Sequence, residues 1–264
     1  MLFIEDLEPQ RQVCYENGLV LSGGGAKGYA HIGVLKALNE KGIFPDVISG
    51  TSAGAVMAAL YADGHTPDEM LKLLSGKDVY NLLQIVLPKR GLFKMKDLTS
   101  VLKKNLKARR IEDLKIKTFI CATNFSTGRV RYFYEGPIIK PILASASIPV
   151  LFQPVKINEE WYVDGGMFAN LPVEPLEGKC KRLIGVHANP FGYMDKNESG
   201  MANTIERVFS LSTRVNVLQD VSACDWYMEP PELKPYAMLS IKKSQELFEI
   251  GYEYAIDYLE KKGL

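Results

Sequence analysis

Two short apolar runs in this sequence each end in a glycine-rich turn that leads at once into a helical pattern. The run Leu19–Leu21 is followed by Gly23–Gly25 and then by helical spacing over Tyr29–Asn39. The run Val47–Ser49 is followed by a stretch of small residues, Ala53–Ala62, which also indicates a helix. Short strands that alternate with helices are typical of α/β proteins. The sequence therefore predicts an α/β fold.

The rest of the chain continues this alternation. Thr66–Glu69 is a capping box with proline at the first helical position, so a helix should begin there. Ser126–Gly128 separates two β-branched and aromatic runs, which indicates a hairpin. Trp226–Met228 is compatible with a buried strand and with the wall of a groove. Further strands are expected at 118–124, 130–134, 156–157, 161–163 and 183–187, and further helices at 98–106, 204–222 and 244–261.

No boundary in composition divides the chain, and its length suits one large domain. We expect a single domain over residues 1–264, with a motif-bearing core at about 18–176 and a C-terminal helical part at about 195–264. The formal net charge is +1, which argues against a nucleic-acid partner. The cysteines are far apart and the histidines show no zinc-ligand spacing. We therefore expect no metal and no cofactor.

Scattered thiols in a domain of this size indicate buried, reduced cysteines and a cytoplasmic protein. The start of the sequence has no basic region followed by an apolar run, and no apolar run is long enough to span a bilayer. Any contact with lipid is then expected at a membrane surface, from the aqueous side. The apolar segment 82–93 with its cationic end, Lys89 and Arg90, fits either a cover over a lipid site or ordinary core packing.

The second glycine-rich turn has the pattern G-x-S-x-G. Gly50-Thr51-Ser52-Ala53-Gly54 lies between an expected strand and an expected helix. A nucleophilic serine needs this sharp strand-to-helix turn, because the turn projects its hydroxyl outward, and the glycines leave room for the bend. The helix directs its N-terminus at the same place and favours negative charge there. Ser52 is therefore the candidate nucleophile, with Gly50 and Gly54 shaping its turn.

The first glycine-rich turn, Ser22–Gly28, has three interpretations. Its glycines fit a dinucleotide-binding loop, but Asp46 precedes the second strand instead of ending it. A phosphate-binding loop would need lysine and serine or threonine after the last glycine, where Tyr29 stands. In the third interpretation, backbone N–H groups of Gly23, Gly24 and Gly25 form an oxyanion hole, and Lys27 adds positive charge or is solvated. A neighbouring G-x-S-x-G favours this third interpretation.

A nucleophilic serine also needs a base. His31 lies within the first helix, His65 lies in a turn, and His187 ends a strand, where a histidine is more often structural than catalytic. Asp164 ends the strand pattern Trp161–Val163 and is followed by two glycines, which let its carboxylate approach another element closely. Because a carboxylate is a weak base near neutral pH, a Ser–Asp pair depends strongly on an oxyanion hole.

The ordered motifs GGGAKG, GTSAG and DGG together resemble the patatin-like phospholipase family, as does the stretch SASIPVLFQPV before DGG. The resemblance runs from about Gly18 to about Leu176, with a weaker echo around Gly251. It implies a three-layer α/β/α fold with a central, mostly parallel sheet, and a Ser–Asp dyad of Ser52 and Asp164. It also implies an oxyanion hole at the glycine loop, with Lys27 at the family's basic position.

The expected function is therefore that of a serine hydrolase of acyl lipids, of phospholipase A, lysophospholipase or carboxylesterase type. An acyl lipid or another ester would be its substrate. An acyltransferase would use the same acyl-enzyme with a different acceptor. A protein that binds lipid or a nucleotide without catalysis is the alternative from another class.

Overall fold

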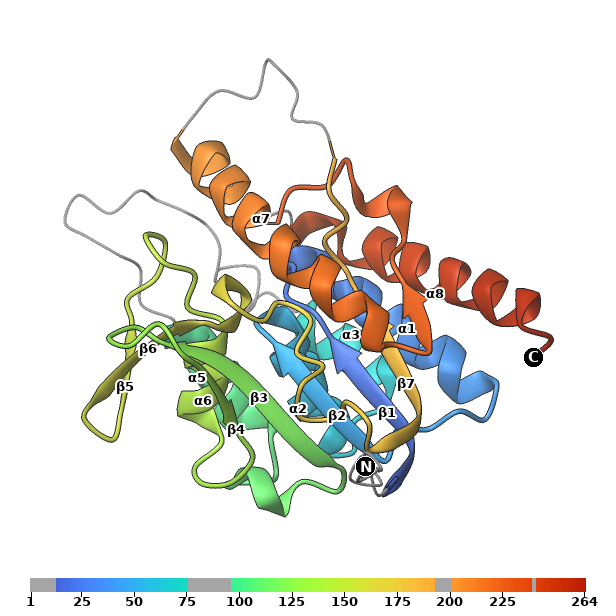
Figure 1. Cartoon of the computed structure of the whole chain (residues 1–264), viewed down its shortest axis with the longest axis horizontal. Helices are drawn as coiled ribbons and strands as arrows, with labels where there is room; N and C mark the ends of the chain where they lie inside the picture. Colours follow the sequence, from blue (N-terminus) through green and yellow to red (C-terminus); the bar gives the residue numbers. More distant parts are fainter. Residues whose placement is uncertain (1–12, 76–95, 193–200, 239–240) are drawn as a thin grey trace, which may run out of the picture.

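The fold is built on one eight-stranded sheet. The computed structural model describes residues 13–75, 96–192, 201–238 and 241–264. The strands lie in the order β5-β6-β3-β2-β1-β7-β8, and β4 pairs with β3 off this path (Figure 1). Their bounds are Tyr15–Leu21 (β1), Val47–Thr51 (β2), Lys117–Asn124 (β3), Val130–Phe133 (β4), Val155–Ile157 (β5), Glu160–Asp164 (β6), Cys180–Val186 (β7) and Trp226–Met228 (β8). The pairs among β3, β2, β1, β7 and β8 are parallel, and those that involve β4, β5 and β6 with their neighbours are antiparallel.

Helices cover both faces of this sheet. The named helices are Tyr29–Glu40 (α1), Ala53–Ala62 (α2), Pro67–Leu74 (α3), Lys96–Asn105 (α5), Ile139–Ser145 (α6), Met201–Asp220 (α7) and Ser244–Lys261 (α8). Successive strand residues point to opposite faces. In β1, Leu19 and Leu21 therefore join the large core under α1, α2, α3, α5 and α8, whereas Val20 faces a smaller core. That smaller core also contains Val217 of α7 and Leu171, Val173 and Leu176 of the turns that follow the DGG motif. The expected three-layer α/β/α arrangement is confirmed.

Most expected elements are present with small shifts at their ends. The capping box at Thr66 is formed, with the Thr66 hydroxyl accepting from Glu69 N–H and the Glu69 carboxylate accepting from Thr66 N–H. The hairpin β3–β4 pairs as expected, the strands expected at 156–157 and 161–163 pair as β5 and β6, and Trp226–Met228 is the edge strand β8. Helix α6 was not predicted, because its proline at position 141 and its short length weaken the helical signal. Of the four cysteines expected to be buried, Cys121 is buried, Cys180 and Cys224 are partly buried, and Cys14 is exposed near the start of β1.

Asp46 lies at the amino end of β2, where its carboxylate accepts a hydrogen bond from Asn17 N–H at 2.9 Å. The glycine loop follows the carboxyl end of the adjacent parallel strand β1. Asp46 therefore lies at the opposite ends of the strands from the loop. A ribose bound at the loop would be out of reach of its carboxylate. The segment 82–93 lies outside the described residues. Within the described ranges, no helix combines the length and apolar character needed to cross a membrane.

A close helix crossing in the core joins α1 to α8 through two glycines. A Cβ added at Gly33 would lie 2.1 Å from the carbonyl oxygen of Phe248, and one at Gly251 would lie 2.2 Å from that of Ala30. Both contacts are with backbone, so neither can be relieved by rotating a side chain. The weaker resemblance to the family around Gly251 thus coincides with a position where the close packing of α1 and α8 leaves no room for a side chain.

Gly251→Ala is expected to destabilise the protein by about 2 kcal/mol or more, because the added methyl group must push the two helices apart. The measurement is the free energy of unfolding from urea denaturation followed by circular dichroism. Glu253→Ala, two residues along on the exposed side of α8, is the control and should change stability by less than about 0.5 kcal/mol. Equal stability of the Gly251→Ala and parent proteins would contradict the close crossing.

Candidate active site

Ser52 occupies a strained turn between β2 and α2. Its φ of 54° and ψ of −120° lie outside the regions that non-glycine residues ordinarily adopt. Space for this turn comes from the flanking glycines. A Cβ at Gly50 would lie 2.6 Å from the carbonyl oxygen of Gly54, and one at Gly54 would lie 2.2 Å from that of Leu21. The glycines of G-x-S-x-G are thus sterically required, and Ser52 is the N-cap residue of α2.

Strand register brings Asp164 to the same level of the sheet as Ser52. Thr51 at the end of β2 pairs with Cys121 of β3, and the next residue, Ala122, pairs with Asp164 at the end of β6. Only β3 separates the two chain segments, so their backbones are about 10 Å apart. Two inward side chains can close such a gap. The polar end of the DGG turn therefore lies beside the nucleophile turn.

One short segment after β4 holds both residues. The Ser145 hydroxyl accepts a hydrogen bond from Ser52 N–H at 2.8 Å, and the carbonyl of Ser147 accepts one from Asp164 N–H at 2.9 Å. Both serines are fully buried. The stretch that begins at Ser145, which suggested the family, therefore has a physical role. It fixes the backbone of Ser52 relative to that of Asp164.

The Asp164 carboxyl is completely buried. Burial raises its pKa to about 7, against the opposing effects of the Ser52 hydroxyl and of the Gly166 N–H. Oδ1 accepts that N–H at 2.8 Å, whereas Oδ2 has no hydrogen-bond partner among the described residues. A carboxylate with one oxygen anchored and the other unpaired can accept a proton from a neighbouring hydroxyl near neutral pH.

The glycine loop lies directly against Ser52. A Cβ at Gly23 would be 3.2 Å from the Ser52 Cβ, and Gly25 has a positive φ of 57°. Gly23 N–H donates to the carbonyl of Asn170 at 3.2 Å, so this amide is already engaged. Across the described part of the chain, Gly24 and Gly25 donate their N–H groups to no other backbone group. Of the three expected donors, these two are available to an oxyanion.

Lys27 is buried behind the loop rather than solvated. Its ammonium donates to Asn189 Oδ1 at 3.0 Å. Burial lowers the pKa of Lys27 to about 8, and the charge of nearby Glu206 opposes this shift. Lys27 thus remains predominantly charged at neutral pH and contributes positive potential next to the loop, although its ammonium is bonded to Asn189.

The three histidines are bound elsewhere. His31 Nε2 lies 2.9 Å from the carbonyl of Ser22, and burial lowers the pKa of His31 to about 4, so its ring is neutral. His65 Nε2 lies 3.1 Å from the carbonyl of Asn105. His187 Nδ1 lies 3.0 Å from Glu229 Oε1. Among the described residues, none of the three rings forms a hydrogen bond with Ser52 or Asp164. Asp164 therefore remains the candidate base.

Asn170 is a site residue that the sequence did not single out. Its side-chain amide is buried, and neither Oδ1 nor Nδ2 has a hydrogen-bond partner among the described residues. Oδ1 would lie 2.5 Å from a Cβ at Gly23 and 2.9 Å from one at Gly166. The amide thus lies between the glycine loop and the DGG turn. A buried amide without hydrogen bonds costs free energy, so the Asn170 side chain is available to bind a ligand. In the sequence, the only signal for Asn170 was its position six residues after Asp164.

Helix α7 closes the other side of the DGG turn. The Asn216 side chain donates to the carbonyl of Gly166 at 3.1 Å and accepts from Asn170 N–H at 3.0 Å. The ring of Phe209 would lie 3.1 Å from a Cβ at Gly166. The inner face of α7 therefore touches the backbone that positions Asp164. Across the described segments, no group of three or more His, Cys, Asp and Glu side chains could hold a metal ion.

Comparisons with solved structures agree with this architecture. VipD from Legionella pneumophila superposes with a TM-score of 0.60 at 16% identity, over 94% of this chain and 67% of that one. The type III effector protein ExoU superposes with a TM-score of 0.52 at 18% identity, over 96% of this chain and 54% of that one. At these identities the likeness concerns the fold alone.

Sequence comparisons are more specific. The chain is 31% identical to lysophospholipase nte1 of Aspergillus terreus over 95% of its own length, and 29% identical to the patatin-like phospholipase domain-containing protein ZK370.4 of Caenorhabditis elegans over 90%. It spans only 18% and 20% of those two proteins. The sequence profile described as patatin-like phospholipase matches residues 19–177, which include the glycine loop, Ser52 and Asp164. The chain belongs to the patatin-like phospholipase family.

Proposed function

We propose that the protein is a lipid acyl hydrolase that uses Ser52 as nucleophile and Asp164 as base. The observation that supports this most directly is the pairing of a strained, buried serine with a buried carboxyl that has one unpaired oxygen. Strain at a single non-glycine residue persists only when the surrounding structure imposes it, and it is concentrated at functional sites. The lysophospholipase name of relatives at about 30% identity supports lipid as the substrate.

The reaction proceeds through an acyl-enzyme. Ser52 Oγ attacks the ester carbonyl carbon while its proton passes to Asp164, and the carbonyl oxygen becomes an oxyanion. The carbon–oxygen bond of the leaving alcohol then breaks, and the alcohol takes the proton from Asp164. Water attacks the acyl group in the same way, with Asp164 as base, and releases the fatty acid and free Ser52. The proton balance closes at each half-reaction without a metal.

The oxyanion is stabilised by the glycine loop. The available N–H groups of Gly24 and Gly25 and the charge of buried Lys27 lie at the start of a short helical turn, Gly25–Gly28. A preorganised donor of this kind contributes about 3 kcal/mol to transition-state stability. This contribution offsets the weakness of a carboxylate base, which is why the loop and the dyad must operate together.

Access to lipid is provided by the outer face of α7. Four large apolar residues on this face, Val208, Leu211, Val215 and Leu218, are 62%, 47%, 63% and 64% exposed. Their spacing of three and four residues places them in one stripe, opposite the inner face that touches Gly166. An exposed apolar stripe backed by the catalytic turn suits a lipid surface, which carries the substrate in aggregated form.

A fluorophosphonate probe traps an activated serine as a tetrahedral adduct. The parent protein should gain one adduct by intact mass, and Ser52→Ala should gain none. Ser126→Ala, in the exposed turn between β3 and β4, is the control and should label like the parent. Labelling of folded Ser52→Ala at the parent rate would refute Ser52 as the nucleophile.

The pH dependence of hydrolysis should report the Asp164 carboxyl. A base must be deprotonated, so kcat/KM should rise about tenfold per pH unit below pH 7 and level off above it, following the pKa of about 7. Asp164→Asn should lower kcat by about a hundredfold or more. The measurement is kcat/KM for a soluble p-nitrophenyl ester from pH 5 to 9.

Asp220 is the control for this profile. Burial and the neighbouring carboxylates of Glu177 and Glu174 also raise its pKa to about 7. Asp220→Asn should retain both the activity and the inflection near pH 7. If Asp220→Asn lost the inflection and Asp164→Asn remained active, the pH profile would belong to Asp220, and Asp164 would be refuted as the base.

Charge placed in the α7 stripe should reduce binding to lipid. Leu211→Glu and Val215→Glu are each expected to weaken binding to phosphatidylcholine vesicles about tenfold, because a carboxylate replaces apolar contact. Sedimentation with sucrose-loaded vesicles measures this. Phe44→Glu adds the same charge at a 55% exposed residue just before β2, at the opposite edge of the sheet, and should bind like the parent. Unchanged binding of both α7 variants would exclude this face as the contact.

A further inference from the structure

A second polar pocket lies beside the candidate active site, between α7, the end of β7 and the segment after β8. Its volume is about 250 Å³. Polar and charged residues among those that line it are His187, Asn189, Arg214, Tyr227, Glu229 and Lys234. The reaction proposed above uses none of these side chains. The pocket suits a small polar ligand and is smaller than typical pockets for larger ligands.

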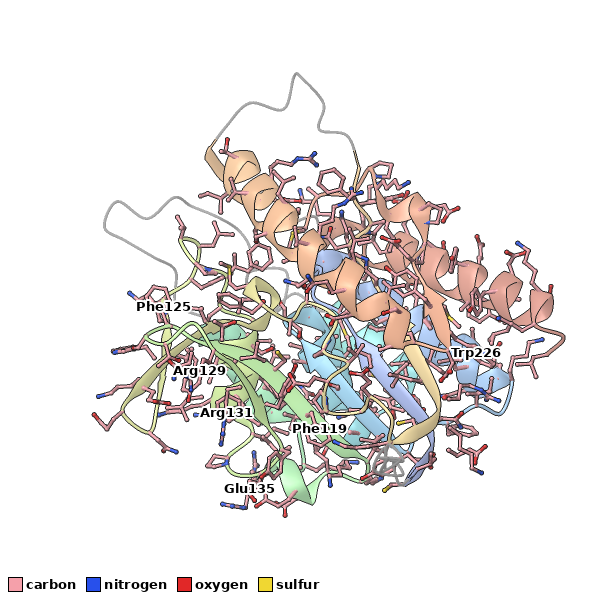
Figure 2. The ribbon with its side chains drawn as sticks, in the orientation of Figure 1. Phe119, Phe125, Arg129, Arg131, Glu135 and Trp226 are labelled. Carbon is pink, nitrogen blue, oxygen red and sulfur yellow. The ribbon has the colours of Figure 1, made fainter. Side chains whose placement is uncertain are left out.

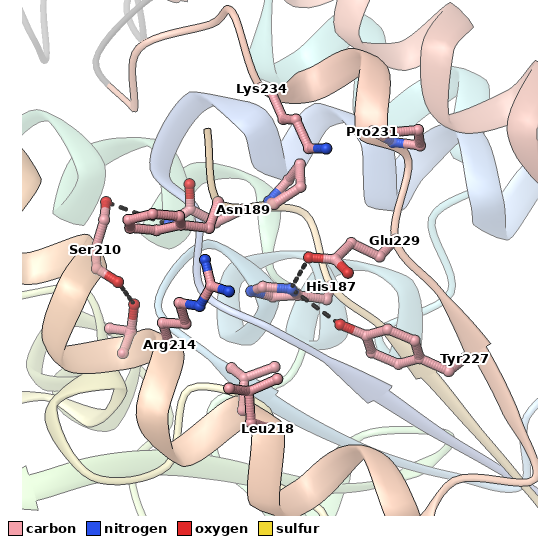
Figure 3. Close-up of a pocket in the computed structure, with 13 residues that line it drawn as sticks. His187, Asn189, Ser210, Arg214, Leu218, Tyr227, Glu229, Pro231 and Lys234 are labelled. Carbon is pink, nitrogen blue, oxygen red and sulfur yellow. Dashed lines mark hydrogen bonds and ion pairs between the residues drawn. The ribbon is translucent and has the colours of Figure 1, made fainter. Parts of the chain in front are cut away.

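The floor of the pocket is a fixed histidine. His187 is buried, and its Nδ1 lies 3.0 Å from Glu229 Oε1 and 3.1 Å from the Tyr227 hydroxyl (Figure 3). These two contacts set the orientation of the ring. Its other nitrogen points away from them, toward the Arg214 side of the pocket. A ring held in this way presents one nitrogen to a ligand, as bound histidines at ligand sites do.

The walls supply positive charge. The Arg214 guanidinium lies 4.3 Å from the centre of the Phe191 ring, and the Arg207 guanidinium lies 4.0 Å from the same centre. Arg207 and Arg214 thus place two positive charges over the ring of Phe191. Over the described ranges, neither guanidinium has a carboxylate within ion-pair distance. Lys234 enters from the segment after β8. Among the described residues that line the pocket, Glu229 is the only one with a carboxylate, and it already contacts His187.

We propose that this pocket binds a phosphate group. Cationic side chains line it from two elements, Arg214 from α7 and Lys234 from the segment after β8, and the free ring nitrogen of His187 faces the Arg214 side. Two cationic side chains beside a single, already engaged carboxylate suit the charge of a phosphate group, whose oxygens can accept two parallel hydrogen bonds from the Arg214 guanidinium. The shared chemistry is that of free inorganic phosphate and of a glycerophosphodiester headgroup.

The pocket is connected to the glycine loop through two residues. Ala188 N–H donates to the Ser22 hydroxyl at 3.0 Å, and Asn189 Oδ1 accepts from the Lys27 ammonium at 3.0 Å. Asn189 also lines the pocket. A phosphate held there would therefore contact the strand end that supports the loop. The binding itself does not depend on the proposed hydrolysis.

The test is isothermal titration at fixed ionic strength with inorganic phosphate, with sn-glycero-3-phosphocholine and with acetate. The parent should show saturable one-to-one binding of at least one phosphate compound and none of acetate. Tighter binding of inorganic phosphate would identify free phosphate as the source, and tighter binding of the diester would identify the headgroup. Equal binding of acetate, or no binding of either phosphate compound, would overturn the proposal.

Arg214→Gln and Lys234→Gln should each weaken phosphate binding about tenfold, because a charge-assisted hydrogen bond is lost. Arg207→Gln is the matched control. It removes the same charge from the same aromatic ring but does not line the pocket, and it should weaken binding less than about threefold. Ser52→Ala should bind like the parent, which separates this site from the hydrolase. Parent-like affinity in both pocket variants would overturn the assignment.

Discussion

The strained turn at Ser52 is the constraint on which the rest of the site depends. A non-glycine residue with φ of 54° needs neighbours that impose it, and apart from Gly54 these neighbours come from two distant segments. Gly54 packs on the Leu21 carbonyl, Gly23 packs on Ser52, and the Ser145 hydroxyl binds Ser52 N–H. Each contact requires the parallel pairing of β1, β2 and β3 in the observed register. The register of these three strands therefore holds Ser52 in its unfavourable backbone conformation.

Burial then determines the chemistry at this turn. In water an aspartate would be far too weak a base for a serine hydroxyl, but complete burial raises the pKa of Asp164 to about 7. The cost of burying that carboxyl is kept tolerable by the Gly166 N–H, and burial leaves Oδ2 unpaired. Lys27 changes in the opposite direction, since burial lowers its pKa to about 8. Burial thus shifts the pKa values of both Asp164 and Lys27 toward neutral pH.

Local patterns allowed much of this to be predicted. The glycine turns, the capping box at Thr66, the hairpins and the ends of α2 depend on neighbours in sequence. Asp164 was favoured because two glycines follow it. Asn170, the Ser145–Ser147 contacts and the pocket at His187 were not predicted, because each depends on segments that are far apart in sequence and meet only through the register of the sheet. Figure 2 shows how densely side chains from these separate elements fill the space around the sheet.

Helix α7 connects the separate parts of the molecule. Its inner face holds the DGG turn through Asn216 and Phe209, its outer stripe is apolar and exposed, and its third side carries Arg214 into the polar pocket. A rigid-body shift of this one helix would move all three at once, because all three belong to one continuous helix of 20 residues. The proposed lipid contact, the proposed phosphate site and the backbone that positions Asp164 therefore lie on three sides of one helix.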